Sequence, residues 1–199
     1  MSPTGVRRFA LVALGVALGV AVGVGARFFL VEDMPGLVEI KIGGPFALTD
    51  QNGQRRTEAD FRGRLMLLAF GYTNCPDVCP LDLQLMADAL DKLGPAAQAV
   101  QPVFVTVDPK RDTAEKLKSY VTHFSPRLLG LTGNDAETAA AAKAFRVYYK
   151  LNGDPAKDSE YSVDHSAFIF LMGRDGKFLA SFSPDTPVER LADTLRQHL

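Results

Sequence analysis

Hydrophobic residues fall into short continuous runs and into longer stripes with helical spacing. Residues 65–70 form a continuous apolar run, and 103–107 are apolar apart from Thr106, which predicts two strands buried on both faces of a sheet. Between them, apolar residues recur every third or fourth position across 81–93, and this predicts an amphipathic helix that ends at Gly94-Pro95. This strand–helix–strand order is typical of an α/β domain.

Turn signals predict two hairpins on either side of this unit. Asn52-Gly53 favours a tight turn within 46–57, and Gly173-Arg174-Asp175-Gly176 separates expected strands at 166–172 and 177–182. The polar segment 151–163 is expected to be irregular.

Three further helices are predicted from capping boxes, in which a polar residue at the helix start pairs with a glutamate three positions later. The pairs are Asp112 with Glu115, Asn134 with Glu137, and Thr186 with Glu189, the last with Pro187 as the first helical residue. Taken in order, the elements predict an α/β fold of the thioredoxin-like sandwich type.

An uncharged apolar segment, 9–26, follows Arg7 and Arg8. Its eighteen residues would extend about 27 Å as a helix, close to the roughly 30 Å of a bilayer's hydrocarbon core. We therefore expect an N-terminal transmembrane helix. The expected parts are a membrane anchor over 1–31, a tether over 32–45 and a folded domain over 46–199.

A cleaved signal peptide is the alternative interpretation of this segment, because Val24-Gly25-Ala26 resembles a small-residue cleavage site. If the anchor is retained, Arg7 and Arg8 should stay cytoplasmic, which places the domain across the membrane. The whole chain has a formal net charge of −1, and removing the three arginines up to Arg27 makes it −4. With no cluster of basic residues, the composition argues against nucleic-acid binding.

The two cysteines of the chain, Cys75 and Cys79, lie between the first apolar run and the predicted helix. A disulfide across so short a loop would stabilise the fold by only about 2 kcal/mol, against about 4.7 kcal/mol for a hundred-residue loop. The positive end of the helix dipole favours thiolates at this place. We therefore interpret the pair as functional, either as a redox couple or as two metal ligands.

Spacing and histidine position refine the interpretation without deciding it. Three residues separate the cysteines, whereas thioredoxin-like oxidoreductases place two between theirs, usually after a tryptophan, which this chain lacks. The wider turn lets both sulfurs face one ion, although a disulfide remains geometrically feasible. His123 and His198 are expected at helix ends on the surface. His165 follows the polar segment, where a structural role is the commoner one for a single histidine.

Two thiolates and one imidazole would suit Cu(I), which prefers sulfur ligands. Structural zinc would need a fourth ligand such as Asp77 or water, and Asp77 is more simply explained as a solvated turn residue.

Four segments of the sequence resemble the Sco (SenC-type) family of copper proteins, and the likeness covers the chain from about residue 40 to the end together with the N-terminal anchor. The segments are Gly43-Gly44-Pro45-Phe46 with Asp50 and Gly53, Phe70-Gly71-Tyr72-Thr73 leading into Cys75-Pro76-Asp77-Val78-Cys79-Pro80, Val107-Asp108-Pro109 with Arg111-Asp112-Thr113, and Val163-Asp164-His165-Ser166.

The resemblance implies a thioredoxin-like domain tethered to the bacterial inner membrane and facing the periplasm, or to the mitochondrial inner membrane and facing the intermembrane space. It further implies one copper ion, as Cu(I) and also as Cu(II), held by Cys75, Cys79 and His165. The implied role is maturation of the dinuclear copper centre in subunit II of cytochrome c oxidase. In that role the chain would deliver copper or reduce the recipient's cysteines, and other copper chaperones are further implied partners.

Other functions stay open at this point, including whether the chain is an enzyme. Cys75 and Cys79 could be the redox-active pair of a thiol–disulfide reductase for which copper is incidental. A peroxidase of the peroxiredoxin or glutathione-peroxidase type shares the broad fold, but no residue selects it. A copper or redox sensor is disfavoured by the short segment that precedes the apolar run.

Overall fold

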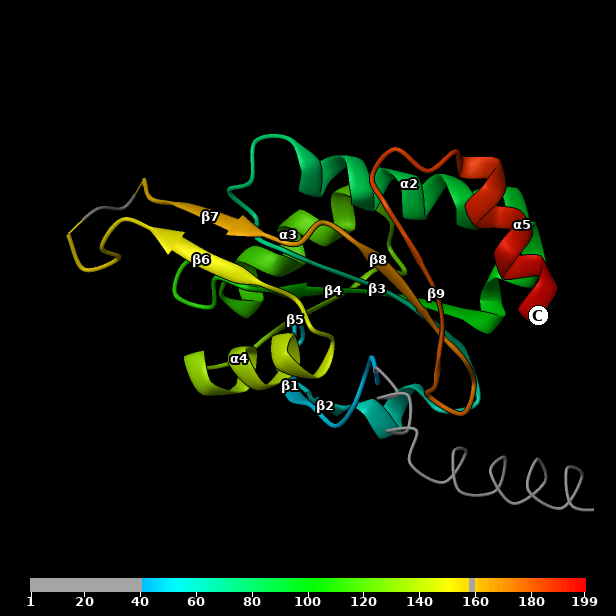
Figure 1. Cartoon of the computed structure of the whole chain (residues 1–199), viewed down its shortest axis with the longest axis horizontal. Coiled ribbons are helices and arrows are strands. Elements are labelled where there is room, and N and C mark those ends of the chain that lie inside the picture. Colours follow the sequence, from blue (N-terminus) through cyan, green and yellow to red (C-terminus); the bar gives the residue numbers. More distant parts are fainter. Residues whose placement is uncertain (1–40, 158–159) are drawn as a thin grey trace, which may run out of the picture. The chain divides into compact units, whose positions relative to one another are not determined.

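The computed structural model describes residues 41–157 and 160–199. Its large sheet contains β1 (Ala47–Asp50), β2 (Arg55–Thr57), β3 (Leu65–Gly71), β4 (Val100–Thr106), β5 (Leu129–Thr132), β8 (Ile169–Met172) and β9 (Phe178–Phe182). The strand order is β2-β1-β5-β4-β3-β8-β9 (Figure 1). A separate two-stranded sheet pairs β6 (Tyr149–Asn152) with β7 (Ser162–His165).

Helices cover both faces of the large sheet (Figure 1). They are α2 (Val78–Leu93), α3 (Ala114–Phe124), α4 (Asp135–Ala144) and α5 (Val188–His198), with 3-10 helices η1 (Glu58–Phe61) and η2 (Gly94–Ala99). Every residue of β3 is buried because its alternate side chains enter two different cores. Leu67 packs with residues of α2, α3 and α5, whereas Leu68 packs with residues of α4.

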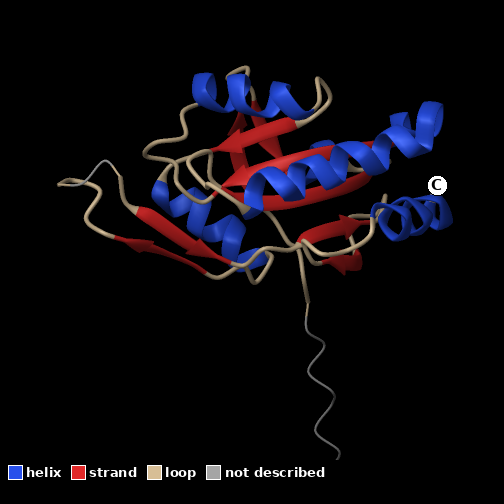
Figure 2. Ribbon diagram, turned by 90° about the horizontal axis from the view of Figure 1, so that it is seen from above, coloured by secondary structure: helices blue, strands red, loops and turns tan. Residues whose placement is uncertain are grey.

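The topology brings two loops to one edge of the sheet. β3 and β4 run parallel, and Gly71 at the end of β3 lies opposite Thr106 at the end of β4. The loop with the two cysteines and the loop that begins at Val107 therefore leave the sheet side by side. β6 and β7 extend away from the large sheet near this edge (Figure 1, Figure 2).

Several predicted elements are confirmed: both hairpins, the apolar strand from Leu65, the helix that ends at Leu93, and the capping box of Asn134 with Glu137. The second predicted strand is also confirmed, although β4 begins three residues earlier, at Val100. The order of the predicted strands and helices indicates an α/β sandwich of the thioredoxin-like type, and the described domain has this fold.

Two predicted helix starts are wrong. Thr113, not Asp112, caps α3 by accepting a hydrogen bond from the Lys116 backbone N–H, because tertiary contacts take up the Asp112 carboxylate. α5 begins at Val188 after Pro187, with no side-chain cap. The Thr186 hydroxyl instead lies 3.4 Å from the Ser183 hydroxyl.

The prediction for 151–163 is also wrong at both ends of that segment. β6 and β7 pair across it, with Leu151 opposite Val163 and Tyr149 opposite His165. Consequently His165 ends a strand, and the strand predicted from Ser166 begins only at Ile169. β5 was not predicted because its four residues are too short for a clear pattern.

In the two described ranges, no helix is long and apolar enough to cross a membrane. The expected anchor over 1–31, and most of the tether over 32–45, lie outside the described residues.

Candidate metal centre

The two cysteines occupy the turn between β3 and α2. The Cys75 backbone N–H donates to the Tyr72 carbonyl at 3.2 Å, which closes the turn after the strand. α2 begins at Val78, three residues earlier than its apolar stripe, so Cys79 lies in the first helical turn. Both thiols are reduced and buried, with 9% of Cys75 and 2% of Cys79 exposed. Cys75 is therefore the more accessible of the two sulfurs.

His165 reaches the cysteines from the end of β7. Its Nε2 lies 3.1 Å from the Cys79 Sγ, and its Nδ1 lies 3.1 Å from the Ser166 carbonyl oxygen. A proton on Nδ1 can be donated to that carbonyl, which orients the ring and leaves Nε2 to face the sulfurs. The Tyr72 ring packs edge-on against the imidazole, with centroids 5.9 Å apart.

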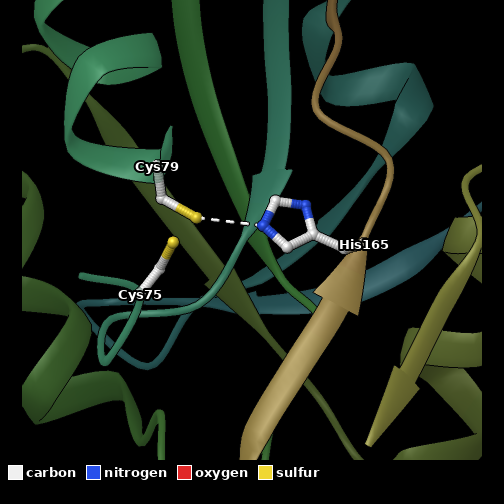
Figure 3. A group of neighbouring side chains, drawn as sticks. All are labelled: Cys75, Cys79 and His165. Carbon is white, nitrogen blue, oxygen red and sulfur yellow. Dashed lines mark hydrogen bonds between the residues drawn. The ribbon is translucent and has the colours of Figure 1, made fainter. Parts of the chain in front are cut away.

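The ligand atoms of Cys75, Cys79 and His165 all lie within 4.8 Å of one another (Figure 3). Within the described ranges this group has no fourth His, Cys, Asp or Glu member. Asp77, considered above as a fourth ligand, is exposed and does not belong to the group. His123 and His198 are exposed on α3 and α5, as predicted.

The two thiols differ electrostatically. A hydrogen bond from the Cys79 thiol lowers the pKa of Cys75, and His165 lowers it further. The same hydrogen bond, together with burial, raises the pKa of Cys79. Burial opposes a charge on His165, but the neighbouring Cys75 sulfur and the hydrogen bond to the Ser166 carbonyl outweigh it and raise the His165 pKa. The opposite shifts of the two cysteines favour the thiolate on Cys75 over a thiolate on Cys79.

A buried carboxyl group near the cysteines was missed by the sequence analysis. Asp82 lies in α2 one turn after Cys79 and is 2% exposed. Its Oδ1 has no hydrogen-bond partner in the described structure. Burial raises the pKa of Asp82 to about 6, while His165 lowers it. The i, i+3 spacing from Cys79 to Asp82 could have indicated that both residues share one helix face.

Gly71, the last residue of β3, makes room for the Cys79 sulfur. A Cβ at this position would lie 2.6 Å from the Cys79 Sγ and 2.9 Å from the Phe104 ring. We expect Gly71→Ala to destabilise the fold by about 1–3 kcal/mol and to change the alkylation rate of Cys79, because the sulfur must move. Denaturant unfolding and thiol labelling of the reduced chain measure both effects.

Gly44→Ala is the matched control, since a Cβ there meets only the Ala144 Cβ, at an ordinary 3.5 Å. Equal effects of the two substitutions on stability and labelling would contradict the steric explanation.

Comparison with known proteins places this geometry in a family. The SCO1/SenC family model matches residues 36–199. The human mitochondrial SCO2 homolog is 43% identical over 158 residues, covering 78% of this chain and 59% of the human protein. The chain thus spans about three fifths of the length of that curated relative.

Two solved structures share the fold. Copper-bound ScoI of Bradyrhizobium japonicum is 44% identical, with a TM-score of 0.73 over 79% of this chain and 99% of that one. BsSco, described as having a disulfide switch and as a member of the Sco family of cytochrome c oxidase assembly proteins, is 25% identical, with a TM-score of 0.63 over 79% and 93% of the two chains. The family match and the identities agree, and the chain belongs to the SCO1/SenC family.

Proposed function

We propose that this chain is a copper chaperone that binds one copper ion through Cys75, Cys79 and His165. It passes the ion to the dinuclear copper centre of cytochrome c oxidase subunit II, or prepares the thiols of that centre. The observation that carries the proposal is the convergence of the three ligand atoms within 4.8 Å. The copper-bound relative from Bradyrhizobium japonicum and the oxidase-assembly description of BsSco support it.

The donor set fits copper better than structural zinc. Two thiolates and a borderline imidazole suit Cu(I), which accepts sulfur-rich sites with few ligands. Structural zinc sites usually close with four protein ligands. The described residues bring together three, and the nearby Asp77 is exposed outside the group.

The accessibility of the site suits a cargo ion. Cys75 is the more exposed of the two cysteines and His165 is half-buried, so a partner's thiolate can approach the ion from this side and replace one ligand at a time. Copper binding needs both thiols reduced, because a Cys75–Cys79 disulfide removes both thiolate ligands. The redox state of the pair then controls copper loading.

A second candidate function is reduction of a partner's disulfide. The observation that favours it is the inequality of the thiols: Cys75 has a lowered pKa and greater exposure, as an attacking thiolate requires, while the more buried Cys79 has a raised pKa. Loss of copper affinity without loss of oxidase assembly would favour this candidate over copper delivery.

The proposal includes a membrane tether. The apolar segment 9–26 supports an anchor over 1–31, followed by a tether over 32–45 and the domain over 46–199. The domain would then face the periplasm of a bacterium, or the intermembrane space of a mitochondrion, where the oxidase copper centre is assembled.

Copper titration of the full-length reduced chain, purified in detergent, tests the proposal. We expect about one equivalent of Cu(I) to be retained through a desalting column. Cys75→Ala should abolish this retention, and His123→Ala, which changes an exposed histidine of α3, should not. A reduced, folded chain that retains no copper would refute the proposal.

A further inference from the structure

The loop between β4 and α3 contains buried charges that metal binding does not explain. Asp108 is 1% exposed and Asp112 is fully buried. Buried carboxylates are costly unless they are paired and hydrogen-bonded, so each must have specific partners. The loop lies at the edge of the sheet where the cysteine loop begins, and its Val107 N–H donates to the Gly71 carbonyl at 2.8 Å.

Asp112 holds the start of the cysteine loop. Its carboxylate accepts hydrogen bonds from the Thr73 backbone N–H at 2.9 Å and from the Thr73 hydroxyl at 2.5 Å. It also accepts one from the Thr106 hydroxyl at 2.6 Å and faces the Lys116 ammonium at 3.7 Å. Because Thr73 lies two residues before Cys75, these contacts fix the chain that leads into the dithiol.

Asp108 and Arg111 hold the other half of the site. The Arg111 Nε donates to one oxygen of Asp108, and the Tyr161 hydroxyl donates to the other. The Arg111 Nη1 donates to the Tyr161 carbonyl at 2.8 Å, and its guanidinium lies 3.6 Å from the centre of the Tyr161 ring. Asp108, Arg111 and Tyr161 thus contact one another in a closed network, and Tyr161 directly precedes β7.

The contacts among Asp108, Arg111 and Tyr161 matter because the β6–β7 hairpin is joined to the rest of the domain through its side chains. In the described structure its two strands pair with each other and not with the large sheet (Figure 2). Tyr161 and Val163 are its buried side chains, and His165 is its last residue. Arg111 also lies 5.6 Å from the centre of the Tyr72 ring, which packs against His165.

We propose that the β4–α3 loop positions the two halves of the metal centre through different side chains, Asp108 and Arg111 fixing the histidine hairpin and Asp112 the cysteine loop. These are positioning residues that do not touch the ion. Loosening the first set lets His165 leave while the dithiol stays in place. The identity of the ion as copper rests on the proposed function, whereas the positioning itself does not.

Hydrogen–deuterium exchange of the metal-free, full-length chain in detergent tests the proposal. In Arg111→Gln we expect the amides of residues 162–165 to exchange about tenfold faster than in the wild type, since a charge-assisted contact is lost. Tyr161→Phe keeps the ring and loses only the hydroxyl, so about a threefold increase is expected. The amides of β3 and β4 should be unchanged in both variants.

Two controls separate positioning from general destabilisation. Arg127 also binds backbone carbonyls, those of Ala97 and Val100, but at the opposite end of β4. Arg127→Gln should leave the exchange of 162–165 unchanged. Thr73→Val removes a hydroxyl that donates to Asp112. It should alter the alkylation rate of Cys75 without altering exchange of 162–165.

Copper release gives an independent second measurement. Arg111→Gln should release Cu(I) to a chelator about tenfold faster than the wild type. If the wild type binds no copper, the proposed function fails while the exchange experiment still decides the positioning. The inference is overturned if residues 162–165 exchange at the wild-type rate in folded Arg111→Gln, or equally fast in Arg127→Gln.

Discussion

A chain with His165→Ala is expected to bind Cu(I) at least about 100-fold more weakly than the wild type and to keep its dithiol chemistry. Mutating a residue that only hydrogen-bonds a metal ligand already lowers metal affinity by about 10–100-fold. Loss of His165, whose Nε2 faces the sulfurs directly, should cost at least as much. Cys75 in the turn after β3 and Cys79 in the first turn of α2 are unchanged, so exchange with a small disulfide should continue. Competition with a Cu(I) chelator and the rate of disulfide exchange measure the two properties.

The same variant separates the two candidate functions in cells. His123→Ala is the matched control, because His123 is an exposed histidine on α3. If oxidase assembly fails with His165→Ala and proceeds with His123→Ala, copper delivery is supported. Assembly that proceeds at the normal rate with His165→Ala would show that reduction of partner thiols is the working function.

Oxidation of the two cysteines to a disulfide is expected to abolish copper binding completely. A disulfide between Cys75 and Cys79 consumes both thiolates and leaves His165 as the single ligand. Mass spectrometry confirms the loss of two hydrogens, and copper bound per chain should fall from about one to zero. Re-reduction with an excess of small thiol should restore it.

The oxidised Cys75→Ala chain is the control, since it cannot form the internal disulfide and should bind little copper in either state. Retention of a full equivalent of copper by the oxidised wild type would contradict the dithiol ligand set.

The cysteine half of the site was predictable from local pattern. The apolar run of β3 and the stripe of α2 bracket Cys75 and Cys79 on both sides, so the strand-to-helix turn follows from the sequence alone. The start of the helix was misjudged because Val78 and Cys79 precede its apolar stripe. Hydrophobic periodicity detects the buried face of a helix but does not detect a first turn whose side chains face a metal site.

The histidine half was not predictable from local pattern. His165 is 86 residues from Cys79, and the polar composition of 151–163 hides the β6–β7 hairpin that carries it. The alternation of buried Tyr161 and Val163 with exposed Ser162 and Asp164 is a strand signal, but it spans only four residues. The family resemblance, not spacing, indicated the ligand.

Asp112 shows why local rules fail near a site. Its sequence fits a capping box, yet the carboxylate bonds to Thr73, 39 residues away, because the parallel pairing of β3 and β4 brings the two loops together. Thr113 supplies the cap instead. Tertiary contacts of this kind override a capping preference worth about 1 kcal/mol.

X-ray absorption at the copper edge of the reduced, copper-loaded full-length chain measures the ligand set itself. We expect a first coordination shell of two sulfur atoms and one nitrogen atom, from Cys75, Cys79 and His165. The nitrogen should disappear from the spectrum of His165→Ala and stay in that of His123→Ala. A wild-type shell without nitrogen, or with one sulfur atom, would contradict the three-ligand site.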